Sequence, residues 1–132
     1  MNTSLQASTT LAGVNVLVVE DDYLIAKEVA MILQAHGASV LGPVPDVSRS
    51  RTLLSSSTPD CAVLDINLKS QFVFELAEEL RDRGVPAIFA TGYDASFLPR
   101  SLRDAPCLYK PVDPRDLVRL VHEGASVHRL RR

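Results

Sequence analysis

The chain has 132 residues, of which 46% are hydrophobic and 23% are charged, and this size and balance fit one globular domain. The formal net charge of −2 argues against a direct nucleic-acid partner, because such domains are usually basic. No apolar run approaches the roughly 20 residues that cross a bilayer, and the N-terminus does not resemble a signal peptide. Cys61 and Cys107 lie in apolar runs without zinc-site spacing, which predicts reduced thiols in a cytoplasmic protein that does not insert into membranes.

Short apolar runs rich in valine and isoleucine alternate with longer segments of helical periodicity, which indicates βαβ units. Residues 1–12 are expected to form a flexible tail, and residues 13–132 a single domain. The first predicted strand is Val14–Val19, which is apolar at nearly every position, as in a strand buried on both faces. A helix ending at Gly37 follows. Its expected apolar face is formed by Ile25, Val29, Ile32 and Leu33.

The second strand is predicted at Ala38–Leu41, and Gly42–Pro45 is expected to form a turn. A weaker helix follows, with Asp46 or Ser48 as its N-cap. Cys61–Leu64 is the third predicted strand, and it is again apolar throughout.

The third predicted helix ends at Gly84, and Val85–Ala90 forms the fourth strand. The apolar positions of this helix are Val73, Leu76, Ala77 and Leu80. The segment after the fourth strand has room for only a short or irregular helix. Cys107–Tyr109 is the fifth strand, and the last helix opens near Asp113. The order of elements predicts an α/β fold of the (βα)5 type, with flavodoxin-like strand order 2-1-3-4-5.

Polar residues stand at the strand ends, where ligands bind in such sheets. They are Glu20, Asp21 and Asp22 after the first strand, Asp65 after the third, Thr91 after the fourth and Lys110 after the fifth. Clustered carboxylates repel unless a cation neutralises them, and hard oxygen ligands suit Mg²⁺. A metal, a hydroxyl and an ammonium group could share the oxygens of a phosphoryl group, which predicts Asp65 as a phosphoryl acceptor.

In these strand-end residues and their flanking strands, the chain resembles the receiver domain of response regulators in two-component signalling. The matching segments, in the family's order, are Val16–Asp22, Ala62–Leu68, Phe89–Tyr93 and Lys110–Pro111. The resemblance implies a receiver fold and Mg²⁺-dependent transfer of a phosphoryl group from a histidine kinase or histidine phosphotransfer protein.

For the metal site, the resemblance implies that Glu20 and Asp21 form the acidic pair, with Asp21 the more direct ligand. Asp65 is the implied phosphorylation site and a further metal ligand. Asn67 is expected to offer its backbone carbonyl to the metal, with its side chain near the acyl phosphate. Asp22 is a possible modulator, but a helix N-cap is the favoured role because aspartate is a preferred capping residue.

For the switch, the resemblance implies that the Thr91 hydroxyl bonds the phosphoryl group and moves on activation. Lys110 pairs with Asp65 or its phosphate, and the bond to Pro111 is expected to be cis. Tyr93 belongs to a Phe-Ala-Thr-Gly-Tyr run resembling a subgroup of stand-alone receivers, and it is a possible modulator. Cys107 stands where many receivers carry the aromatic residue of the switch, which puts that part of the switch in doubt.

Further positions depart from the family's pattern or carry no predicted chemistry. Lys69–Gln71 replaces the usual proline and glycine after the phosphorylation site, and Tyr109 is expected at the surface or against a partner. No metal or phosphohistidine role is expected for the histidines, which are His36, His122 and His128.

The function predicted from the sequence is that of a single-domain receiver without an output domain. It is expected to be a phosphoacceptor switch rather than an enzyme, a monomer or weak dimer that signals through a protein partner or drains phosphate from a kinase. One alternative is a binding module that works without phosphorylation. Another is a Mg²⁺-dependent phosphohydrolase, which would need an acid where Asn67 stands and a substrate pocket for which the short loops leave little room.

Overall fold

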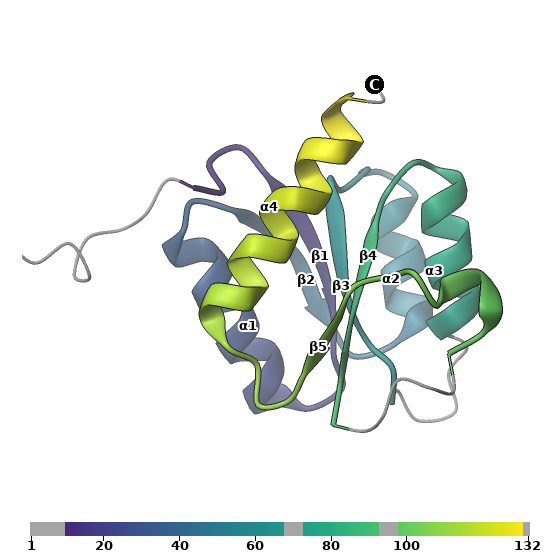
Figure 1. The fold of residues 1–132 in the computed structure, drawn as a ribbon, viewed down its shortest axis with the longest axis horizontal. Helices are drawn as coiled ribbons and strands as arrows, with labels where there is room; N and C mark the ends of the chain where they lie inside the picture. Colours follow the sequence, from purple (N-terminus) through teal and green to yellow (C-terminus); the bar gives the residue numbers. More distant parts are fainter. Residues whose placement is uncertain (1–9, 68–72, 93–97, 131–132) are drawn as a thin grey trace, which may run out of the picture.

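The computed structural model describes residues 10–67, 73–92 and 98–130. One parallel sheet runs through the molecule in the order β2-β1-β3-β4-β5 (Figure 1), which confirms the predicted flavodoxin-like fold. Its strands are β1 (Asn15–Val19), β2 (Ser39–Val44), β3 (Cys61–Asp65), β4 (Ala87–Thr91) and β5 (Cys107–Tyr109). The helical elements are α1 (Tyr23–Ala35), α2 (Val47–Leu54), α3 (Val73–Asp82), the short 3-10 helix η3 (Arg100–Leu102) and α4 (Pro114–Leu130).

Helices cover both faces of the sheet, so the central strands are buried on both sides (Figure 1). On one face, Val16 and Val18 of β1 join a cluster with α1 and α4. On the other, Leu17 and Val19 join a cluster with α2 and α3. This alternation explains why the sequence of β1 is apolar at every position from Val16 onward.

The hydrophobic core includes Leu11, which the sequence predicts to belong to the tail of residues 1–12. Its side chain is fully buried, and its backbone N–H donates to the His36 carbonyl oxygen at 2.8 Å. The buried face of α1 is also shifted toward small residues. Ala26 and Ala30 are buried there, whereas Ile25 and Ile32 are only half-buried, because close packing of α1 on the sheet favours small side chains.

The predicted turn at Gly42–Pro45 is wrong, because β2 continues through Val44. The pairing of β2 with β1 contains a bulge. Leu17 lies opposite Leu41 and Val19 lies opposite Val44, so β2 has one more residue than β1 over this interval. Such a bulge on an edge strand accommodates a glycine with φ +94° and a proline, which has no N–H to donate. The strand therefore reaches far enough for Val44 to accept a hydrogen bond from the Glu20 N–H at 3.0 Å.

The connection between β4 and β5 contains η3 within its described part, in agreement with the short or irregular helix expected there. β4 starts two residues later than predicted, at Ala87. The Val85 N–H donates to the Leu80 carbonyl at the end of α3, and Pro86 lacks an N–H. Among the described residues, no helix combines the length and the hydrophobicity needed to cross a bilayer.

A buried polar cluster that the sequence did not predict lies at the amino ends of β1 and β3, away from the predicted site at their carboxyl ends. The Asp60 carboxylate is 5% exposed and accepts a hydrogen bond from the Asn15 N–H at 2.9 Å. His128 Nε2 and Arg129 Nη2 lie 3.6 and 3.8 Å from its two oxygens. His128 Nδ1 is 2.7 Å from the Gly84 carbonyl oxygen, so the end of α4 is tied to the sheet by polar contacts as well as apolar packing.

Candidate functional site

Three carboxylates converge at the carboxyl ends of β1 and β3. Glu20 and Asp21 follow β1 directly, and Asp65 is the last residue of β3, which is the neighbour of β1 in the sheet. One oxygen from each of the three lies within 4.8 Å of the other two. Glu20 and Asp65 are buried, whereas Asp21 is exposed. Hard oxygen donors with one side open to water are suited to Mg²⁺, which keeps part of its hydration shell in proteins.

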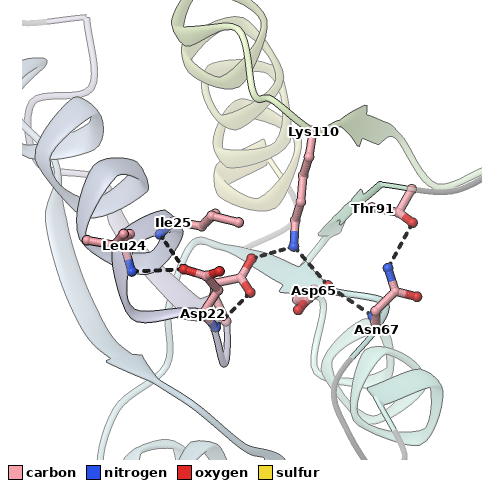
Figure 2. A network of polar contacts seen from close by, with 8 residues as sticks. Asp22, Leu24, Ile25, Asp65, Asn67, Thr91 and Lys110 are labelled. Atoms are coloured by element: carbon pink, nitrogen blue, oxygen red, sulfur yellow. Dashed lines mark hydrogen bonds and ion pairs between the residues drawn. The ribbon is translucent and has the colours of Figure 1, made fainter.

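Lys110 joins two of these carboxylates from the end of β5. Its Nζ lies 2.8 Å from Glu20 Oε1 and 3.2 Å from Asp65 Oδ1 (Figure 2). The Glu20 and Asp65 side chains are only 5% and 2% exposed, so the ammonium group neutralises charge that water cannot reach. The Lys110 backbone N–H donates to the Thr91 carbonyl at 2.8 Å, and the Lys110–Pro111 peptide bond is cis.

The pKa values of these groups diverge in a way that matches different roles. Burial, together with a hydrogen bond to Asp65, raises the pKa of Glu20 from 4.5 to about 7. Burial opposes ionisation of Asp65 too, but hydrogen bonds from the Glu20 carboxyl and the Asn67 N–H, with the charge of Lys110, lower its pKa. Burial likewise disfavours the Lys110 ammonium, but its two carboxylate partners outweigh that effect and raise its pKa. Asp65 is therefore the carboxylate held ionised, and Glu20 is the one that takes up a proton.

Asp22 caps α1, as the sequence favoured. Its carboxylate accepts hydrogen bonds from the Leu24 and Ile25 N–H groups at 2.9 and 3.1 Å (Figure 2). Its own backbone N–H donates to Glu20 Oε2 at 3.1 Å. The Asp22 side chain thus serves the helix, while its backbone helps to orient the buried glutamate.

We expect Asp21→Ala to weaken Mg²⁺ binding at least tenfold, because it removes one of the three clustered carboxylates. Asp22→Ala should leave Mg²⁺ affinity within about twofold and lower the free energy of unfolding by about 1 kcal/mol through loss of the cap. Calorimetric titration with Mg²⁺ and urea denaturation of both variants measure the two effects. A larger loss of metal affinity in Asp22→Ala would show that the acidic pair is assigned wrongly.

Asn67 connects the end of β3 to the end of β4. Its backbone N–H donates to Asp65 Oδ1 at 2.9 Å, and its side-chain Nδ2 donates to Thr91 Oγ1 at 3.2 Å (Figure 2). Thr91 is completely buried. The sequence placed both side chains near the phosphorylation site, but it did not indicate a bond between them, because neither residue type has a fixed partner.

Two further predicted positions, Cys107 and Tyr109, are the first and last residues of β5 and differ in burial. Cys107 is half-buried and packs with the cluster on the α2 and α3 side, whereas the Tyr109 side chain is 57% exposed. Both cysteines are free thiols. Tyr93 and Lys69–Gln71 lie outside the described residues.

A groove of about 490 Å³ adjoins the acids, between α1 and the end of β2. Glu20 and Asp21 line one end of it, so the site has more neighbouring space than the short loops suggested. Neither Asp65 nor Lys110 lines this groove. A molecule lying in it would therefore meet the acidic pair but not the predicted phosphoryl acceptor, which gives the phosphohydrolase alternative no support.

The family model described as the response regulator receiver domain matches residues 16–122. Among solved structures, the chain is similar to a CheY-like response regulator receiver domain protein from Methanospirillum hungatei, with 25% identity and a TM-score of 0.78 over 89% of this chain and 98% of that one. The receiver domain of NarL from Mycobacterium tuberculosis, at 21% identity, has the same fold, with a TM-score of 0.75 over 87% of this chain and 98% of that one.

Two curated relatives differ in how much of their length is matched. The "Uncharacterized 14.6 kDa protein in sodA1 3'region" of Leptolyngbya boryana is 32% identical over 86% of this chain and 92% of its own length. The positive alginate biosynthesis regulatory protein of Pseudomonas aeruginosa is 30% identical over 88% of this chain and 49% of its own length. The chain therefore spans nearly all of one relative and about half of the other.

Proposed function

Because the chain belongs to the response regulator receiver family, we propose that it accepts a phosphoryl group on Asp65 from a histidine kinase or a histidine phosphotransfer protein. The observation that carries this proposal is the environment of Asp65. Its carboxylate is almost fully buried, lies 3.2 Å from the Lys110 ammonium and stands beside two further carboxylates. This combination keeps one oxygen nucleophile ionised in a place where a cation and a second anion can be held.

Mg²⁺ fits the three-carboxylate set, and it would be held by Asp21, Asp65 and the Asn67 carbonyl, with Glu20 beside it. The metal would neutralise charge on the incoming phosphoryl oxygens. An Asp65 oxygen attacks phosphorus, the bond from phosphorus to the donor histidine nitrogen breaks, and the histidine keeps the electron pair. Lys110 neutralises the charge that accumulates on the oxygens, and positioning supplies most of the remaining acceleration.

The output in this proposal is a change of surface near β4 and β5. A phosphoryl group adds negative charge and strong acceptors beside Thr91 and Lys110, whose backbones are hydrogen-bonded to each other. A protein partner that reads this region would receive the signal, or the chain would act as a phosphate sink for its kinase. Either role describes a cytoplasmic phosphoacceptor, monomeric or weakly dimeric, rather than an enzyme acting on a separate substrate.

We expect the wild-type chain to gain one phosphoryl group when it is incubated with acetyl phosphate and Mg²⁺, and Asp65→Asn to gain none. The amide retains the shape of the side chain but is not a nucleophile. Intact-protein mass spectrometry measures the gain. Asp60→Asn is a matched control, because Asp60 is also buried but lies at the amino end of β3, whereas Asp65 lies at its carboxyl end. Equal gain in wild type and Asp65→Asn, or no gain in wild type, would refute the assignment.

A further inference from the structure

The hydrogen bond between Asn67 and Thr91 has the asparagine side chain as its donor. Nδ2 is an amide donor, so Thr91 Oγ1 is the acceptor in this contact. The bond fixes the position of a hydroxyl that is completely buried. Thr91 thus has a defined partner in the structure before any phosphoryl group is present.

Asn67 contacts both Asp65 and Thr91, so phosphorylation of Asp65 would change its surroundings. Its backbone N–H donates to Asp65 Oδ1, and its side chain bonds the end of the strand next to β3 (Figure 2). A phosphoryl group on Asp65 would present three strong acceptor oxygens, which attract the Thr91 hydroxyl as a donor. The contact with Asn67 uses Thr91 Oγ1 as an acceptor, so it opposes displacement of that oxygen rather than donation of the hydroxyl proton. If Thr91 moves toward the phosphoryl oxygens, this bond is stretched or broken.

We propose that Asn67 is a positioning residue that holds Thr91 in the unphosphorylated arrangement and opposes its engagement by a phosphoryl group. The inference rests on the proposed function of Asp65 and adds a regulatory element to the same site. It assigns the Asn67 side chain an effect on the switch that is separate from the role of its backbone carbonyl toward the metal.

Beryllofluoride with Mg²⁺ mimics the phosphoryl group on a carboxylate and tests the proposal without bond-making chemistry. We expect Asn67→Ala to bind beryllofluoride about two- to tenfold more tightly than the wild type, the range that one net neutral hydrogen bond allows. In the Thr91→Val background, which lacks the hydroxyl, Asn67→Ala should not tighten binding. Asn15→Ala is the matched control, because Asn15 is an exposed asparagine at the amino end of β1, far from the carboxyl ends where Asp65 and Thr91 lie.

Unchanged or weaker binding in Asn67→Ala would overturn the proposal. Equal tightening in the two backgrounds would also overturn it, because the effect would then not pass through Thr91. A wild-type chain that binds no beryllofluoride would overturn both this inference and the phosphoacceptor function, whereas the preceding outcomes leave that function intact.

A second measurement needs no variant and therefore does not depend on whether Thr91→Val folds. The side-chain amide resonances of Asn67 should shift when beryllofluoride binds to the ¹⁵N-labelled wild type, and their exchange with water should accelerate as the bond to Thr91 is lost. A shift of the resonances is expected for any residue that contacts Asp65, so the exchange rate is the discriminating measurement. An exchange rate that stays unchanged at saturating beryllofluoride would contradict the proposal.

Discussion

Replacing Lys110 with methionine should lower the free energy of unfolding by about 2–3 kcal/mol at neutral pH in the absence of Mg²⁺. The substitution keeps most of the apolar stem but leaves the Glu20 and Asp65 carboxylates, which are 5% and 2% exposed, without their shared cation. Urea denaturation at about pH 7.5, above the Glu20 pKa of about 7, measures the loss of unfolding free energy.

Two conditions should reduce the destabilisation caused by Lys110→Met, and they show whether unpaired charge is responsible for it. Mg²⁺ should restore part of the lost stability, since a divalent cation replaces the missing positive charge. Acidification should also reduce the cost, because Glu20 becomes neutral by taking up a proton. The control is Lys27→Met, in which the altered lysine is exposed on α1. A destabilisation that neither Mg²⁺ nor acid changes would mean that packing, not charge, is responsible.

Mg²⁺ affinity should rise by up to about tenfold per pH unit from roughly pH 5 to pH 7 and then level off. The reason is the pKa of Glu20, which is raised to about 7 by burial and by its hydrogen bond to Asp65, so protons compete with the metal below that pH. Calorimetric titration across this range measures the slope. Glu20→Gln removes the titrating group and should flatten it, whereas Glu28→Gln, an exposed glutamate on α1, should not.

The raised pKa of Glu20 also determines how the free energy of unfolding depends on pH in the absence of metal. Glu20 in the folded chain binds a proton more tightly than in the unfolded chain, where its pKa is near 4.5. The contribution of Glu20 to folding stability is therefore fully present below pH 4.5 and is lost as the pH rises through about 7. Asp65 acts in the opposite sense, because its pKa is lowered and its contribution is lost as the pH falls. A Mg²⁺ affinity that is level from pH 5 to 7 would contradict the assignment of Glu20.

The topology and the convergence of the site could be predicted because both follow from the ends of buried strands. Fully apolar runs identify strands covered on both faces, and the rule for parallel sheets brings their carboxyl ends to one edge. Asp65 and Lys110 meet for that reason, although they are far apart in the sequence. The N-cap at Asp22 was predictable from local chemistry alone.

The features that escaped prediction depend on tertiary contacts between residues with several possible partners. Pro43 reads as a turn residue, but an edge strand with a bulge accepts it. His128 reads as a polar residue near a helix end, yet the fold places it against Asp60. The bond from Asn67 to Thr91 likewise depends on how two neighbouring strands end, which propensities do not describe.

The position of β5 at the edge of the sheet has a consequence for the kinetics of local opening. Within the described residues this three-residue strand pairs with β4 alone, and the segment before it contributes the single turn of η3. Native-state amide exchange should therefore be faster at Leu108 than at Val63 in the centre of the sheet. Since Lys110 directly follows β5, each local opening of this strand would withdraw the ammonium group from Asp65. The fraction of molecules in which Asp65 is paired with Lys110 therefore depends on the local stability of β5.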